Sequence, residues 1–104
     1  MNTFHKTEIF NDWLTNLRDI KARARIAARI VLAEEGNFGD CESVGEGISE
    51  MRLYFGPGYR LYFWRREGTT YWLLAGGDKR SQRRDIERAK KLRRMIEETP
   101  DEDE

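Results

Sequence analysis

Residues 48–82 read ISEMRLYFGPGYRLYFWRREGTTYWLLAGGDKRSQ, and this stretch predicts three consecutive strands. From residue 50 to 55, apolar residues alternate with polar ones, which is the period of a strand with one buried face. The Gly-Pro-Gly sequence at 56–58 supplies a tight reversal, because glycine accepts positive φ and proline presets a turn conformation. Alternation resumes at residues 59–65, and another apolar run covers residues 70–75. Together these features predict an antiparallel meander.

Two arginines lie within the predicted meander. Arg52 belongs to the polar set of its first strand, and Arg60 belongs to its second strand, on the same side as Tyr62 and Trp64. Neighbouring antiparallel strands bring their side chains within contact distance. Arg52 and Arg60 are therefore expected to project from adjacent strands.

The chain before the meander predicts a short strand at residues 3–6 and two helices. Thr7 is a suitable N-cap for the first helix, and Asp19 is one for the second, which extends over residues 20–35. Gly36 then ends the second helix. The apolar stripe of the first helix consists of Ile9, Phe10, Trp13, Leu14 and Leu17. Because little chain separates the helices, they are expected to form an antiparallel hairpin on one face of the sheet.

Residues 36–47, GNFGDCESVGEG, are predicted to form a loop, because they are rich in glycine and acids and show no period. They contain no phosphate-binding motif. After residue 75, Gly76-Gly77 is expected to end the last strand of the meander. Asp78 or Ser81 can then cap a final helix that runs to about residue 97.

The predicted fold class is α+β, in a small domain of two layers that spans residues 1–98. In it, a helix hairpin packs on the sheet and a further helix follows at the C-terminus. Residues 99–104 form an acidic segment, which we expect to be a disordered tail.

Composition argues against several classes of protein. Of the 104 residues, 38% are hydrophobic and 37% are charged, and no apolar run approaches the ~18 residues of a membrane span. The first residues lack the apolar core of a secretory signal. The single cysteine, Cys41, cannot form an internal disulfide, which favours a cytoplasmic location. With one histidine and one cysteine in the chain, neither a metal site nor a cofactor is expected.

Positive charge is concentrated in the body of the chain. Residues 97–104 hold six acids and no base, so residues 1–96 carry 19 bases against 13 acids, a net charge of +6. Within residues 79–94, nine bases face two acids. Such a surface favours a polyanionic partner. The alternative interpretation of this charge run is a solvated helix face.

Three stretches carry a resemblance to a known family. They are FHKTEIFNDWLTNLRD at 4–19, SVGEGISEMRLYFGPGYRLYF at 43–63 and LLAGGDKRSQRRDIERAKKL at 73–92. In these stretches the sequence resembles the RelE/ParE toxin superfamily of bacterial toxin–antitoxin modules, and more narrowly the HigB-like addiction-module killer proteins. The resemblance implies a small α+β domain whose curved, mostly antiparallel sheet carries two N-terminal helices on one face.

The resemblance implies two different activities. RelE-like and HigB-like members are endoribonucleases that cut messenger RNA on the ribosome, whereas ParE-like members inhibit DNA gyrase without cleaving RNA. A third possibility is a basic RNA- or ribosome-binding module without catalysis. The implied partners are the ribosome, messenger RNA and a cognate helix-turn-helix antitoxin, with promoter DNA bound only through the antitoxin complex and no membrane involved. Fold alone cannot choose among these activities.

Five residues form the candidate catalytic set: Arg52, Arg60, Lys79, Gln82 and Glu46. RNA cleavage without a metal needs cations that stabilise a dianionic phosphate, and arginine binds phosphate oxygens with two donors at once. Arg60, Lys79 and Gln82 match segments typical of the subfamily, and Glu46 lies where some relatives carry a catalytic glutamate. No histidine follows residue 5 and no tyrosine follows residue 71 to move protons.

Each basic candidate also has a structural interpretation. Arg52 can pair with a carboxylate across the sheet, and Arg60 can stack on Tyr62 or Trp64. Lys79 can serve only to solubilise the start of the last helix. Glu50 is a second carboxylate available as a base.

Overall fold

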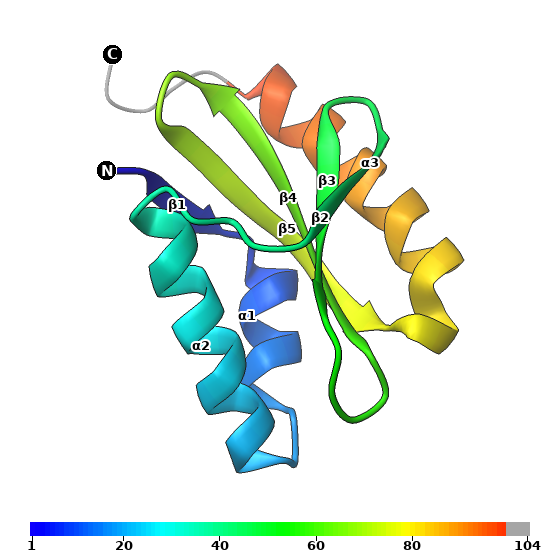
Figure 1. The fold of residues 1–104 in the computed structure, drawn as a ribbon. Helices are drawn as coiled ribbons and strands as arrows, with labels where there is room; N and C mark the ends of the chain where they lie inside the picture. The colour runs from blue at the N-terminus through cyan, green and yellow to red at the C-terminus, as the bar shows by residue number, and fades with distance from the viewer. Residues whose placement is uncertain (100–104) are drawn as a thin grey trace.

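A computed structural model describes residues 1–99 and contains a five-stranded mixed sheet (Figure 1). The strands follow the order β1 (Thr3–Lys6), β5 (Thr70–Asp78), β4 (Tyr59–Glu67), β3 (Ile48–Leu53) and β2 (Cys41–Gly45). β1 pairs with β5 in parallel, and every other neighbouring pair is antiparallel. The predicted α+β class is therefore confirmed, with a mostly antiparallel sheet.

The predicted meander is confirmed as β3, β4 and β5. Arg52 and Arg60 are Cα partners across β3 and β4, so they lie side by side as the alternation indicates. The predicted end of the last strand was wrong. β5 continues through Gly76 and Gly77 to Asp78, because β4 still pairs with these residues.

The prediction of a loop at residues 36–47 was wrong in part, since β2 occupies its second half. Cys41 pairs with Met51 and Glu42 pairs with Glu50, so β2 and β3 form a hairpin. β2 is an edge strand with exposed residues and a break in its register after Ser43. Such a strand is held by backbone pairing on one side, which explains why its sequence shows no apolar alternation.

The two N-terminal helices, α1 (Glu8–Thr15) and α2 (Ile20–Glu34), form the predicted hairpin. Their predicted caps are confirmed: the side chain of Thr7 accepts the Phe10 N–H at 3.0 Å, and that of Asp19 accepts the Ala22 N–H at 3.2 Å. Gly36, with φ of +97°, follows the second helix as expected. Both helices pack on the same face of the sheet.

The opposite face of the sheet is also covered, so the prediction of two layers was wrong. A short 3₁₀ turn, η1 (Lys79–Ser81), leads into α3 (Gln82–Glu98), whose buried Ala89 packs on that face. The reason lies in β4, which carries large apolar side chains on both of its faces and is buried from Tyr59 to Trp64. Tyr59, Leu61 and Phe63 join one core with α1 and α2, while Tyr62 and Trp64 join a second core with α3.

Of the two predicted caps, Asp78 caps the 3₁₀ turn η1 that leads into α3, whereas Ser81 is the N-cap residue of α3 but makes no side-chain capping hydrogen bond to it. The Asp78 side chain accepts the Arg80 and Ser81 N–H groups, and the Ser81 hydroxyl accepts the Asp78 N–H in return. Of the predicted tail, residues 100–104 lie outside the described residues. No helix within residues 1–99 is both long and apolar enough to cross a membrane.

Gly76 and Gly77 allow helices to approach β5 from both faces. A β-carbon on Gly76 would lie 2.2 Å from the Trp13 ring of α1, and one on Gly77 would lie 1.8 Å from Asp85 Oδ2 of α3. Both distances are far below van der Waals contact. The glycines are therefore required by packing and not by a turn, since neither has positive φ.

We predict that Gly76→Ala and Gly77→Ala each lower the free energy of unfolding by about 1–3 kcal/mol, the usual cost of overpacking. Urea denaturation followed by circular dichroism measures this loss. Gly36→Ala is the control, because its β-carbon meets no atom within 4 Å and the variant suffers only from its positive φ. If the stability lost at Gly76 or Gly77 is no larger than that lost in the control, the helices do not pack tightly against β5 at these glycines.

Candidate functional site

The centre of the candidate site is the carboxylate of Glu50, on the α3 side of β3. Glu50 is only 2% exposed. Gln82 Nε2, at the start of α3, donates to its two oxygens at 2.9 and 3.2 Å. Nε of Arg52 and Nε of Arg60 lie 3.7 and 3.9 Å from its Oε2. A buried carboxylate is costly unless donors and opposite charges surround it, and these three side chains supply them.

Arg60 is nearly as buried as Glu50, with 7% of its surface exposed. Its Nη1 donates to the carbonyls of Gly58 and Tyr59, each at 3.2 Å. It makes no cation–π contact among the described residues, and the Trp64 ring instead receives Arg93, at 5.0 Å from its centroid. The stacking alternative for Arg60 is therefore wrong.

Arg52 continues the cluster toward the surface. Its Nη2 lies 2.6 Å from Glu42 Oε2 on β2, and its Nε lies 3.8 Å from Asp40 Oδ2. The exposed Tyr54 hydroxyl donates to Asp40, and this hydrogen bond raises the pKa of Tyr54. Arg52 thus does pair with a carboxylate across the sheet, and its side chain stays 24% exposed.

Lys79 lies at the exposed margin of this cluster, immediately after β5. A β-carbon built on Gly58 would lie 3.6 Å from Arg60 Nη1 and 3.6 Å from Lys79 Cβ, so both side chains flank the same turn. The structure therefore brings Arg52, Arg60 and Gln82 together around Glu50. Lys79 lies beside Arg60 across the turn at Gly58, and its side chain makes no ion pair or hydrogen bond within residues 1–99.

Glu46 is not part of this cluster. It occupies the tip of the β2–β3 hairpin, with φ of +55°, and accepts from Arg94 Nε and Nη2 at 3.1 and 2.7 Å. Arg94 lies in the C-terminal half of α3, whereas Gln82 lies at its start. From Ile48 to Arg52, β3 covers about 13 Å at the usual rise of a strand. The prediction that Glu46 lies with the other catalytic candidates was wrong. The tip of the β2–β3 hairpin places Glu46 beside the C-terminal half of α3, whereas Gln82 lies at the start of that helix.

Two residues, Glu50 and Tyr62, are buried at the site although their positions in the sequence do not indicate it. Glu50 alternates with apolar residues like any surface acid, and only the cover of α3 makes it the buried centre of the site. Tyr62 is fully buried nearby, and its hydroxyl has no hydrogen-bond partner within residues 1–99. Burial, followed by the charge of Glu50, raises the pKa of Tyr62 strongly. Its signal in the sequence is only its place two residues after Arg60.

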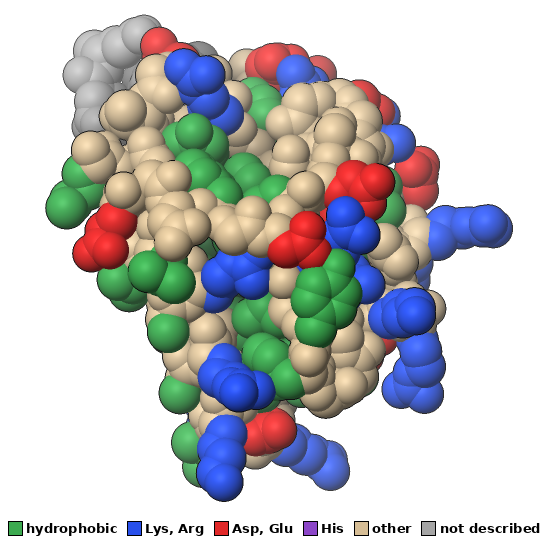
Figure 2. Space-filling view, viewed as in Figure 1, with side chains coloured by type: hydrophobic (Ala, Val, Ile, Leu, Met, Phe, Trp, Pro, Cys, Tyr) green, Lys and Arg blue, Asp and Glu red, His purple; other side chains and the backbone are tan. Residues whose placement is uncertain are grey.

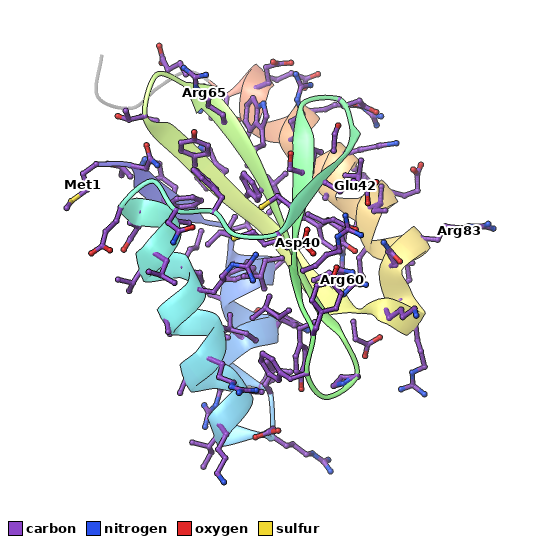
Figure 3. All side chains as sticks on the ribbon, viewed as in Figure 1. Met1, Asp40, Glu42, Arg60, Arg65 and Arg83 are labelled. Atoms are coloured by element: carbon purple, nitrogen blue, oxygen red, sulfur yellow. The ribbon has the colours of Figure 1, made fainter. Side chains whose placement is uncertain are left out.

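Both arginines of the cluster are paired with acids. Arg52 and Arg60 face three carboxylates, which belong to Asp40, Glu42 and Glu50. Figure 2 shows acidic and basic side chains side by side over the middle of this face, and Figure 3 labels Asp40, Glu42 and Arg60 there. Within residues 1–99, no three carboxylate, histidine or cysteine side chains gather as metal ligands would. An anion that binds Arg52 would have to displace Asp40 or Glu42 from its guanidinium.

We predict that Arg60→Met or Glu50→Gln alone lowers the free energy of unfolding by about 3 kcal/mol, because each leaves the other group buried without its partner. In the double variant the loss is smaller than the sum of the single losses. Urea unfolding of the four proteins gives the coupling energy. Arg94→Met, which breaks an exposed pair, is the control and costs clearly less. Strictly additive losses would mean that Arg60 and Glu50 do not interact.

The Glu46–Arg94 pair predicts a pH dependence of stability. The hydrogen bond from Arg94 lowers the pKa of Glu46 below its ordinary value of 4.5. Ionised Glu46 therefore stabilises the fold above pH 4.5, and this contribution is lost as the pH falls below that value. We expect Glu46→Gln to be less stable than the wild type at pH 7, with a difference that narrows as the pH falls below 4.5, by urea unfolding. A difference that does not change with pH would exclude this ion pair.

Comparison with known proteins adds one relationship. No model of a known protein family matches the chain. A protein of Haemophilus influenzae (strain ATCC 51907 / DSM 11121 / KW20 / Rd), described as "Uncharacterized protein", is 46% identical over 86 residues, which cover 83% of this chain and 87% of the relative. At this identity and coverage, the chain belongs to the same protein family as the Haemophilus influenzae protein.

Proposed function

We propose that this protein is a toxin of a type II toxin–antitoxin module, with a RelE-like fold, that cleaves messenger RNA on the ribosome without a metal and so inhibits translation. The observation that carries the proposal is the convergence of Arg52, Arg60 and Gln82 around Glu50 on one face of the sheet, with Lys79 across the turn at Gly58 from Arg60. In this proposal the protein acts in the cytoplasm and a helix-turn-helix antitoxin neutralises it.

An RNA phosphate can replace the carboxylates that now hold Arg52. Asp40 and Glu42 are exposed, with 47% and 59% of their side chains accessible to solvent. Exposed ion pairs contribute only about 0–1 kcal/mol each, so exchanging them for a phosphate costs little. A bidentate phosphate–arginine pair is the stronger interaction. The exposure of Asp40 and Glu42 is thus compatible with phosphate binding at Arg52.

Buried members of the cluster serve to position Arg52. Glu50 lies 3.7 Å from Arg52 Nε and is itself held by Gln82 and by Arg60. A guanidinium fixed in this way loses no further freedom when the transition state forms, which is the condition for electrostatic catalysis. Arg52 would contact the phosphate, while Arg60 and Gln82 are positioning residues.

The proposed reaction forms a bond between the ribose 2′-oxygen and phosphorus and breaks the bond from phosphorus to the 5′-oxygen. The proton of the 2′-hydroxyl passes to a base, and the departing 5′-oxygen receives a proton. Asp40 and Glu42 are the exposed carboxylates beside Arg52 and can accept the first proton. Arg52 and Lys79 offset the charge that develops on the phosphate. The products carry a 2′,3′-cyclic phosphate and a 5′-hydroxyl.

We predict that Arg52→Ala slows cleavage of messenger RNA on purified ribosomes about 100-fold or more, because one preorganised donor supplies about 3 kcal/mol. Lys79→Ala slows it less, because its ammonium is exposed to solvent. Sequencing of 5′-hydroxyl ends, with detection of 2′,3′-cyclic phosphates, measures the rate and identifies the chemistry. Arg65→Ala is the matched control, since Arg65 is an exposed arginine at the other end of the sheet (Figure 3).

Two results would overturn the proposal. One is undiminished toxicity of both Arg52→Ala and Lys79→Ala in growing cells. The other is growth arrest without new RNA ends that is relieved by a resistant gyrase, which would establish the ParE-like activity instead. Tight, salt-dependent binding to ribosomes without cleavage products would indicate a binding module.

A further inference from the structure

A second basic site lies beside the start of α3, outside the Glu50 cluster. An open pocket of about 570 Å³ is bounded by Trp13 of α1, by residues 76–78 at the end of β5, and by one face of residues 80–88. We call it the α3 pocket. Its cations are Arg80, Arg84 and Arg88, which recur every four residues. Arg80 belongs to η1, and Arg84 and Arg88 follow on α3, about 6 Å apart along the helix at 1.5 Å per residue.

The arginines of the α3 pocket are available to a ligand in a way that those of the Glu50 cluster are not. Arg80 and Arg88 are exposed, and their side chains make no ion pair or hydrogen bond within residues 1–99. Arg84 is 82% exposed and approaches one carboxylate, Asp85, at 4.0 Å.

Both acids of the α3 pocket are already engaged by the protein. Asp78 accepts the N–H groups of Arg80 and Ser81. Asp85 is 4% exposed and accepts the Ser81 hydroxyl. Both carboxylates keep their charge, so the three arginines and two acids give the pocket a formal net charge of +1. The N-terminal end of α3 adds its partial positive charge in the same place.

The α3 pocket and the Glu50 cluster meet at the end of β5. Gly77 lines the pocket and is the Cα partner of Arg60, while Ser81 of the pocket immediately precedes Gln82 of the cluster. A chain bound at Arg52 and Lys79 needs to pass only this turn to reach the pocket. The two sites thus lie on opposite sides of the first turn of α3.

The geometry points to a binding site for the backbone of single-stranded RNA in the α3 pocket, next to the bond that the Glu50 cluster is proposed to cleave. A row of arginines suits consecutive phosphates, and a charged groove beside an aromatic side chain is a recurrent way of binding single strands. Trp13 supplies that aromatic wall. The choice of RNA as ligand rests on the proposed function, whereas the existence of the anion site rests on the pocket itself.

The test is the binding of a labelled RNA oligonucleotide with 2′-O-methyl sugars, which cannot be cleaved through the 2′-oxygen. Fluorescence anisotropy at several salt concentrations compares the wild type with Arg84→Ala/Arg88→Ala. We expect the double variant to bind about tenfold more weakly, with a salt dependence reduced by about 1.4, since each phosphate contact to a single strand contributes ~0.7.

Arg83→Ala/Lys91→Ala is the matched control, because it removes the same charge from exposed positions of the same helix outside the pocket. Figure 3 shows Arg83 pointing away from the protein. We expect this control to bind within about twofold of the wild type, with an unchanged salt dependence. Thermal unfolding by circular dichroism verifies that both double variants are folded.

Equal losses in the two double variants would overturn the inference, because diffuse charge would then explain binding. No loss in the pocket variant would also overturn it. Loss of binding to an oligoglutamate peptide, with RNA binding intact, would assign the α3 pocket to an acidic protein segment instead. If Arg52→Ala leaves RNA cleavage unchanged but the pocket variant still loses RNA binding, the anion site stands and the proposed catalytic mechanism falls.

Discussion

The structure depends on one constraint, which is that β4 is apolar on both faces. Its residues from Tyr59 to Trp64 are all buried, so helices must cover both sides of the sheet. The cover from α3 removes Glu50 from water, and a carboxylate in that position needs donors and cations around it. Gln82, Arg52 and Arg60 supply them. The polar cluster is thus a consequence of how the core is closed.

This arrangement gives the arginines of the protein different tasks. Arg60 is buried and holds Glu50, whereas Arg52 spans from the buried carboxylate to the surface. Arg84 and Arg88 project into an open pocket, where their charge is free to act on a ligand. The net charge of +6 in residues 1–96 therefore indicates less about function than the surroundings of each arginine do. Some arginines are held by buried carboxylates, and others are exposed to solvent.

Turn and cap chemistry explains why so much of the fold could be predicted. Thr7, Asp19 and Asp78 cap helices as expected, and the meander has the register that its alternation requires. The edge strand β2 was not predicted. It is held by backbone pairing to β3, and its sequence shows no alternation of apolar and polar residues. The prediction that Gly76-Gly77 ends the last strand was also wrong. These glycines leave room for Trp13 on one face of β5 and Asp85 on the other, and in a sequence such a pair resembles the end of a strand.

The sequence by itself determined the order of the elements other than β2 and named Arg52, Arg60 and Gln82, which meet in the candidate site. Periodicity, caps and embedded cations depend on neighbouring positions, so the sequence contains them. Tertiary structure alone decided which carboxylate belongs there. Glu50 became its buried centre because α3 closes over β3, while the hairpin carries Glu46 to Arg94 at the other end of that helix. Charges that are distant in sequence pair only when whole helices and strands pack together, so a local sequence pattern cannot predict which of them pair.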